Sequence, residues 1–119
     1  MTNEELLKVI EEAKTGQEAI LDLSNQRLAG LPSELFQLPE LNVLDLSGNN
    51  LTELPGAISG LSALTYLDLT GNQLTALPPE ICQLENLEEV MVGGNQLVTP
   101  PQETAEQGLE AIRQYFAGN

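Results

Sequence analysis

The sequence predicts an α/β solenoid, in which short strands and returns stack as repeats between a helical cap at each end. Two observations support this fold class. Aliphatic residues recur in columns with a period of 23 residues, and each unit holds one short stretch in which apolar and polar residues alternate. A fixed period of this length is typical of a repeat array, and the alternation is typical of a strand with one buried face. Because a single unit cannot bury its apolar side alone, the units must stack.

The aliphatic columns define the buried positions of each repeat. In Leu44-Asp45-Leu46 the two leucines fall on one face of a strand and the aspartate falls on the other. Stacked repeats bring equivalent positions into contact, so each column becomes a ladder in the core. The main columns are Leu21, Leu44, Leu67 and Val90; Leu23, Leu46, Leu69 and Val92; Leu28, Leu51, Leu74 and Leu97; and Leu41, Leu64 and Leu87.

An asparagine column and a Leu-Pro pair mark the bend and the return of each repeat. Asn49, Asn72 and Asn95 share one column, and Gln26 has that place in the first repeat. A buried amide side chain there could satisfy backbone groups that no neighbouring strand or helix reaches. The Leu-Pro pair then opens a stiff segment, since proline fixes φ and lacks an N–H. From this point we expect a loose return to the next strand.

The two ends depart from the repeat, as they must if the core of a stack is to be closed. Thr2-Asn3-Glu4-Glu5 has the form of a capping box and predicts a helix that ends near Gly16. Residues 104–116 carry apolar residues at helical spacing. We therefore expect one domain over residues 1–119, with an N-terminal capping helix in 1–17, about four repeats in 18–101 and a C-terminal capping helix in 102–119.

Residues 41–55 resemble the leucine-rich repeat, whose pattern is L-x-x-L-x-L-x-x-N-x-L-x-x-L-P. They read Leu-Asn-Val-Leu-Asp-Leu-Ser-Gly-Asn-Asn-Leu-Thr-Glu-Leu-Pro. Residues 64–78 match the pattern again, and residues 87–101 match it with valine at two leucine positions. The resemblance covers residues 18 to about 101. It implies a curved solenoid, a short leucine-rich-repeat right-handed superhelix with a small parallel sheet on its concave side, where partners usually dock.

The ends of the chain resemble those of the repeat arrays in bacterial Roco proteins. A helical segment at residues 4–11 precedes the first repeat, and residues 100–112 close the array. In that family a GTPase domain follows the array, but this chain has no G-x-x-x-x-G-K-[ST] stretch. Three alternatives stay open. The chain is a regulatory or structural segment of a larger Roco-type GTPase with mainly intramolecular contacts, a freestanding repeat protein, or an engineered, shortened repeat scaffold.

Charge and composition exclude several classes of partner. With 18 acidic residues against 4 basic ones, the net charge is −14, which opposes binding to nucleic acid and to anionic membranes. No stretch approaches the ~20 apolar residues of a membrane-spanning helix, and the acidic N-terminal residues lack the features of a secretory signal. The lone Cys82 fits a reducing compartment. We therefore expect a cytoplasmic protein that binds another protein, and the charge favours a basic partner.

The candidate binding residues are those that point outward between the buried leucines. Tyr66 stands out, because aromatic residues beside aliphatic surface are over-represented among binding hot spots; the alternative is that it only covers the sheet. Asp22, Asp45 and Asp68 form a row that could receive Arg or Lys, although Asp is also common in this motif. The set expected to bind a partner on the concave face is Ile20, Asp22, Ser24, Arg27, Val43, Asp45, Ser47, Asn50, Tyr66, Asp68, Thr70, Gln73, Glu89, Met91 and Gln96.

No motif in the sequence points to catalysis, a metal or a cofactor. The chain has no histidine, and one cysteine cannot make a zinc site. Carboxylates in a flat row do not converge on a point, as calcium ligands must. Without a neighbouring base, Cys82 and the hydroxyl residues have no means of activation. We therefore expect a protein that is not an enzyme and that binds neither metal nor cofactor.

Overall fold

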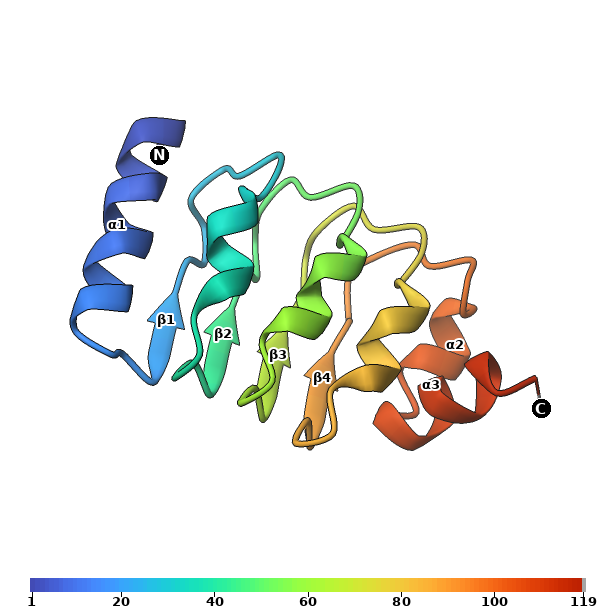
Figure 1. Ribbon diagram of the computed structural model, residues 1–119. Coiled ribbons are helices and arrows are strands. Elements are labelled where there is room, and N and C mark those ends of the chain that lie inside the picture. The colour runs from blue at the N-terminus through green and yellow to red at the C-terminus, as the bar shows by residue number, and fades with distance from the viewer. Residues whose placement is uncertain (119) are drawn as a thin grey trace.

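The computed structural model describes residues 1–118 and contains one four-stranded parallel sheet (Figure 1). The strands are β1 (Ile20–Asp22), β2 (Val43–Asp45), β3 (Tyr66–Asp68) and β4 (Glu89–Met91), and they lie in chain order. The second residues of the four strands, Leu21, Leu44, Leu67 and Val90, are in register. The register therefore equals the 23-residue period of the sequence, and the predicted solenoid is confirmed.

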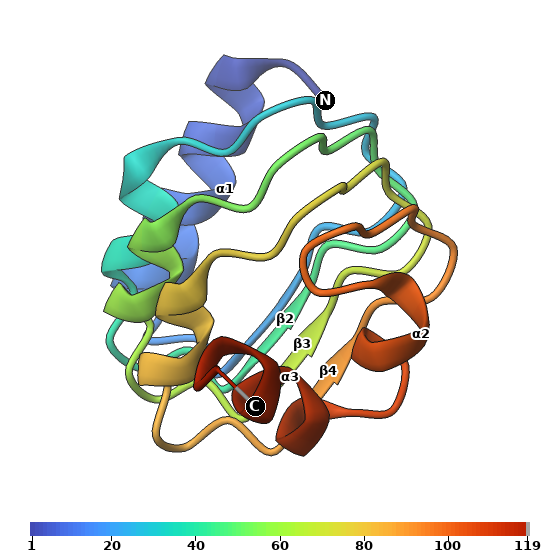
Figure 2. The ribbon, with the colours of Figure 1, turned by 90° about the vertical axis from the view of Figure 1, so that its right-hand side faces the viewer.

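Short 3₁₀ helices form the side of the solenoid opposite the sheet (Figures 1 and 2). They are η1 (Ser33–Gln37), η2 (Gly56–Gly60) and η3 (Pro79–Gln83), and each begins directly after the proline of a Leu-Pro pair. In each case the proline carbonyl accepts a hydrogen bond from the backbone N–H three residues later. The expectation of a loose return was wrong, because this bond closes a turn that the fixed φ of proline already favours.

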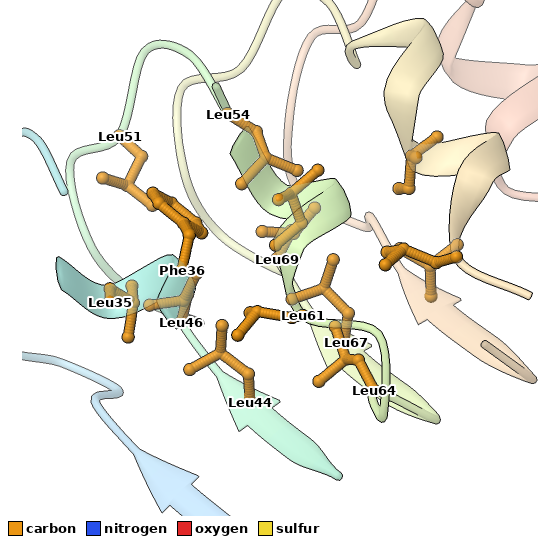
Figure 3. Close-up of a cluster of buried hydrophobic side chains, with 14 of the residues drawn as sticks. Leu35, Phe36, Leu44, Leu46, Leu51, Leu54, Leu61, Leu64, Leu67 and Leu69 are labelled. Atoms are coloured by element: carbon orange, nitrogen blue, oxygen red, sulfur yellow. The ribbon is translucent and has the colours of Figure 1, made fainter. Parts of the chain in front are cut away.

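The core lies between the sheet and the 3₁₀ helices. Figure 3 shows Leu44 and Leu46 of one repeat, Leu67 and Leu69 of the next, and Leu61 in the same cluster of buried side chains. All five side chains are 0% exposed. The predicted ladder of aliphatic columns is therefore the core, and it continues through all four repeats.

The asparagine column ties each repeat to the one before it. Asn72 Nδ2 donates to the carbonyl oxygens of Leu46 (2.9 Å) and Leu69 (3.1 Å), and its Oδ1 accepts from the backbone N–H of Leu51 (3.1 Å). Asn49 and Asn95 make the equivalent bonds, each to its own repeat and to the repeat before it. The predicted role of this column is confirmed, because the bonded backbone groups have no partner in a regular element.

Helix α1 (Asn3–Thr15) closes the N-terminal end of the core. Its capping box is complete, since Thr2 Oγ1 accepts from the backbone N–H of Glu5 (3.1 Å) and Glu5 Oε1 accepts from the backbone N–H of Thr2 (2.8 Å). One apolar face of the helix is buried, through Leu6, Ile10 and Ala13, and α1 contacts η1. The capping helix expected from the sequence is therefore present.

Two short helices, not one, close the C-terminal end. They are α2 (Gln102–Ala105) and α3 (Leu109–Phe116), seen end-on in Figure 2. The single C-terminal capping helix predicted from residues 102–119 is therefore wrong over the described residues; Asn119 lies outside them. Gly108 separates the two helices with φ of 112°, a conformation that no helical residue adopts and that glycine tolerates. The break lets Ala105, Leu109 and Ile112 all reach the core.

Candidate functional site

The outward side of the sheet, here called the sheet face, carries the predicted binding residues. The first residues of the four strands lie in register and form one row, and the third residues form a second row. Neighbouring strands in a sheet lie about 4.8 Å apart, so each row spans about 14 Å. The structure thus brings together the residues that the alternation of the strands assigned to one face. The first row is Ile20, Val43, Tyr66 and Glu89, and the second is Asp22, Asp45, Asp68 and Met91.

The first row is apolar over three of its four strands. Ile20 is 64% exposed, an unusual value for a large aliphatic side chain, while Val43 and Tyr66 are half-buried. Met91 adds a further exposed apolar side chain at the end of the second row, where it is 39% exposed. The sheet face therefore offers aromatic and aliphatic surface to solvent at its centre and at both ends.

The aspartates of the second row are fixed by the turn that follows each strand. Asp22 Oδ1 accepts from the backbone N–H of Ser24 (2.9 Å) and from its hydroxyl (2.6 Å). Asp45 makes the same pair of bonds with Ser47, and Asp68 Oδ1 accepts from the backbone N–H of Thr70. One oxygen of each carboxylate thus accepts the hydrogen bonds that hold the turn after its strand. Within residues 1–118 no hydrogen bond reaches the second oxygen, which remains available to a partner.

Electrostatics on the sheet face are negative. The hydroxyl and the backbone N–H of Ser24 hold the pKa of Asp22 below its usual value, because both hydrogen bonds favour the ionised carboxylate. The pKa of Tyr66 is raised, first by partial burial and then by the carboxylates of Asp68, Glu89 and Asp45. Negative charge next to the phenol disfavours phenolate. A cation brought to this place would meet an unbalanced negative field.

The remaining predicted residues lie at the ends of the strands and on the rim. Ser24, Ser47 and Thr70 are half-buried and are the partners of the aspartates, so their polar groups are partly occupied. Asn50, Gln73 and Gln96 are exposed rim residues. The fourth rim residue, Arg27, is also exposed but has φ of 59° and lines a hollow beside the N-terminal end of α1 with Met1, Asn3 and Leu6.

One part of the face was missed by the sequence analysis. Beyond β4 lies an open hollow of about 530 Å³, lined by Glu88, Glu89, Met91, Glu106 and Leu109. It joins the sheet face to the C-terminal cap. No repeat column could have revealed it, because Glu106 and Leu109 belong to the non-repetitive end, whose position depends on the break at Gly108.

Groups that could support metal or redox chemistry are sparse over residues 1–118. No cluster of three His, Cys, Asp or Glu side chains is arranged to hold a metal ion within that range. Cys82 is half-buried in η3 against the core, and burial raises the pKa of its thiol despite the opposing effect of Arg113. None of the helices described is long and apolar enough to cross a membrane.

Comparison with known families gives the same fold. A family model described as a leucine-rich repeat matches residues 19–74. The fold is a leucine-rich repeat. A leucine-rich-repeat protein of Leptospira interrogans superposes with a TM-score of 0.72 at 37% identity, over 82% of this chain and 25% of that one. No curated protein matches the sequence.

Other leucine-rich-repeat structures come from plants and beyond. A chain of the BIR3–SERK2 complex from Arabidopsis thaliana has a TM-score of 0.56 at 38% identity, over 65% of this chain and 43% of that one. The leucine-rich-repeat domain of APL1B has a TM-score of 0.57 at 19% identity, over 82% of this chain and 37% of that one, and shows the fold alone. This chain therefore spans between a quarter and less than half of the structures it resembles.

The fold carries a general expectation about function. Leucine-rich-repeat domains are in general protein-interaction modules and are typically non-catalytic. The finer resemblance to bacterial Roco proteins has no support in these matches and stays a prediction.

Proposed function

We propose that this chain binds a partner protein through the sheet face. The observation that carries the proposal is the register of the four strands, which sets the apolar row of Ile20, Val43 and Tyr66 directly beside the row of three aspartates. An apolar centre next to charged groups is the usual arrangement of a binding hot spot and its rim.

Tyr66 is the expected centre of the interaction. Its half-buried ring loses little rotational freedom on binding, since the sheet already holds it, and aromatic side chains contribute more than most to interfaces. Val43 lies next to it on β2, and Glu89 lies next to it on β4. A partner side chain placed over Tyr66 would therefore touch both apolar and charged surface.

A basic partner surface is expected. The aspartates offer carboxylates whose positions are set by Ser24, Ser47 and Thr70, so little side-chain entropy is lost when a cation approaches. The net charge of −14 would speed the encounter with a basic partner, and this effect would weaken as salt is added.

The test compares one sheet-face variant with one variant on the opposite side. A partner is first captured with the wild-type chain, and its affinity is then measured by calorimetry for Y66A/D45K and for Q83A/E85K, in and after η3. We expect the sheet-face variant to lose at least about thirtyfold in affinity, the cost of removing a hot spot of about 2 kcal/mol, and the control to bind as wild type does. Equal affinities for the sheet-face variant and the wild type, with an unchanged melting temperature, would refute the proposal.

The alternatives drawn from the sequence are also testable. If the chain is a segment of a larger Roco-type GTPase, its main contacts are intramolecular, and an antibody against this domain would detect a product several times its size in source lysate. A product of the size of this chain would instead favour a freestanding binding module. Either result is compatible with binding at the sheet face. The bound group would be another domain of the same chain in the first case and a separate protein in the second.

A further inference from the structure

Strand β1 is an edge strand whose outer side has backbone groups without a partner strand. Among the described residues it pairs with β2 alone. Val43 N–H donates to the Ala19 carbonyl (2.9 Å), and Leu23 N–H donates to the Asp45 carbonyl (2.8 Å). Since backbone groups alternate in direction along a strand, positions 19, 21 and 23 face β2, and Ile20 and Asp22 present their N–H and C=O groups to the outside.

This edge is open in a way that the other edge is not. Ile20 is 64% exposed, and Asp22 is also exposed. On β4 the same alternation turns the backbone groups of Val90 and Val92 outward, where Ala105 and Glu106 of the C-terminal cap line a hollow with them. The Val92 carbonyl also accepts a hydrogen bond from Gln102 Nε2 (3.0 Å). The C-terminal cap therefore bonds to its edge strand, whereas helix α1 packs against η1, and within residues 1–118 no hydrogen bond reaches the outward backbone groups of Ile20 and Asp22.

We propose that the edge of β1 takes up an extended basic segment of a partner as a fifth strand. The added strand would place an apolar residue next to Ile20 and, two positions along, a lysine or arginine next to Asp22. Strand addition satisfies the outward backbone groups of Ile20 and Asp22, and side chains directly opposite on one face lie about 5 Å apart, close enough to pair. This inference goes beyond binding over Tyr66, because its contacts are main-chain bonds at the edge.

The charge at the edge selects this occupant. Asp22 lies at the β1 end of the row of aspartates, and Ser24 fixes its Oδ1, so an added strand would lie next to a carboxylate that has no cation as a partner within residues 1–118. A second copy of the chain would bring another Asp22 and a net charge of −14 to the same place, and like charges across a strand pair destabilise it. A lysine or arginine in register with Asp22 would instead pair its positive charge with the row of aspartates.

The first step of the test measures the edge itself. In the free chain, the amide protons of Ile20 and Asp22 should exchange with solvent at least about tenfold faster than those of Leu21 and Leu23, which are bonded to β2. Slow exchange at all four positions in dilute protein would mean that the edge is covered, and would overturn the proposal. Slow exchange that appears only on concentration would show that a second copy occupies it, which also overturns it.

The second step uses a random heptapeptide library displayed on phage, selected on the immobilised chain. Enriched peptides should carry an apolar residue two positions from Lys or Arg, and a synthetic copy should slow the exchange of Ile20 and Asp22. Ile20→Pro should abolish binding because it removes an outward N–H, which an edge position tolerates. Ile20→Ala keeps that N–H and is the matched control.

The outcomes separate this inference from binding over Tyr66. Edge binding predicts that Tyr66→Ala leaves peptide affinity within about threefold, while Ile20→Pro and Asp22→Lys reduce it at least about tenfold. Failure to enrich any peptide, equal binding by the Pro and Ala variants, or protection only at β2 and β3 would overturn the edge proposal. None of these results would affect the Y66A/D45K test, whose readout does not involve the edge.

Discussion

The side chain of Gln102 serves Leu97 in the way that Asn95 serves Leu74. Gln102 Oε1 accepts a hydrogen bond from the Leu97 backbone N–H (3.0 Å), and Asn95 Oδ1 accepts one from the Leu74 backbone N–H (3.0 Å). Gln102 Nε2 also donates to the Val92 carbonyl (3.0 Å), as Asn95 Nδ2 does to the Leu69 carbonyl (2.9 Å). The first residue of α2 therefore ends the asparagine ladder by replacing the amide of a missing fifth repeat.

Replacing Gln102 by alanine should destabilise the C-terminal end. The Leu97 N–H and the Val92 carbonyl would lose this partner, and an unsatisfied buried backbone group costs about 1–3 kcal/mol. We expect the free energy of unfolding in urea to fall by about 1–3 kcal/mol. Gln107→Ala, at an exposed position between α2 and α3, is the control and should change it little. Equal unfolding curves for the two variants would show that Gln102 does not close the ladder.

An interior rung of the ladder should matter more. Asn72→Ala removes the partner of the Leu51 N–H and one of the two amide donors to each of the Leu46 and Leu69 carbonyls, all inside the stack. We expect a loss of at least about 2 kcal/mol in unfolding free energy. Asn72→Asp keeps the acceptor but not the donors, so it should also be destabilising. The exposed neighbour Gln73→Ala serves as the control, and a loss as small as the control's would contradict the assigned role.

A core leucine tests the register of the strands. Leu46 is 0% exposed, and Leu46→Ala should lower the free energy of unfolding by about 2–5 kcal/mol through lost burial and a cavity. Val98, which is 68% exposed, provides the matched control, because Val98→Ala removes apolar atoms that already contact water. Thermal and urea denaturation of both variants would measure the difference. If Leu46→Ala cost less than about 0.5 kcal/mol, the register would be inverted, with Leu46 on the outer face of the sheet.

The negative field at Tyr66 can be titrated. In a Tyr115→Phe background, the ultraviolet absorbance of phenolate reports Tyr66 alone, because the chain has 2 tyrosines. Burial and the nearby carboxylates raise its pKa, so removing one of these charges with Asp68→Asn should lower that pKa towards the ordinary value. Added salt should lower it in the same direction. A pKa that does not move with either change would mean that the aspartate row exerts no field on the ring.

Much of this fold could be predicted from the sequence, because every repeat restates the same physical constraint. Leu44 and Leu67 must contact each other in any stack with a 23-residue period, and the alternation in β2 and β3 then fixes which residues face outward. The asparagine role also followed, since a side-chain amide can both donate to carbonyls and accept from an N–H at a bend.

The non-repetitive features could not be predicted in the same way. Gln102 lies seven residues after Asn95, not 23, so no column identifies it as the last rung. The helical periodicity of residues 104–116 ran across Gly108 and hid the break between α2 and α3. The bond from Gln102 to the edge of β4, and the lack of one at the edge of β1 within residues 1–118, depend on how each cap packs, which is a property of tertiary contacts and not of spacing.

Carboxyl footprinting of the complex tests the sheet face most directly. Carbodiimide labelling, read by mass spectrometry, would compare the chain alone with the chain bound to its captured partner. We expect the partner to protect Asp45, Asp68 and Glu89 on the sheet face and to leave Glu34 and Glu85, on the side of the 3₁₀ helices, labelled as in the free chain. Protection of Glu34 and Glu85 with unchanged labelling of the sheet-face carboxylates would place the partner on the opposite side and contradict the proposed function.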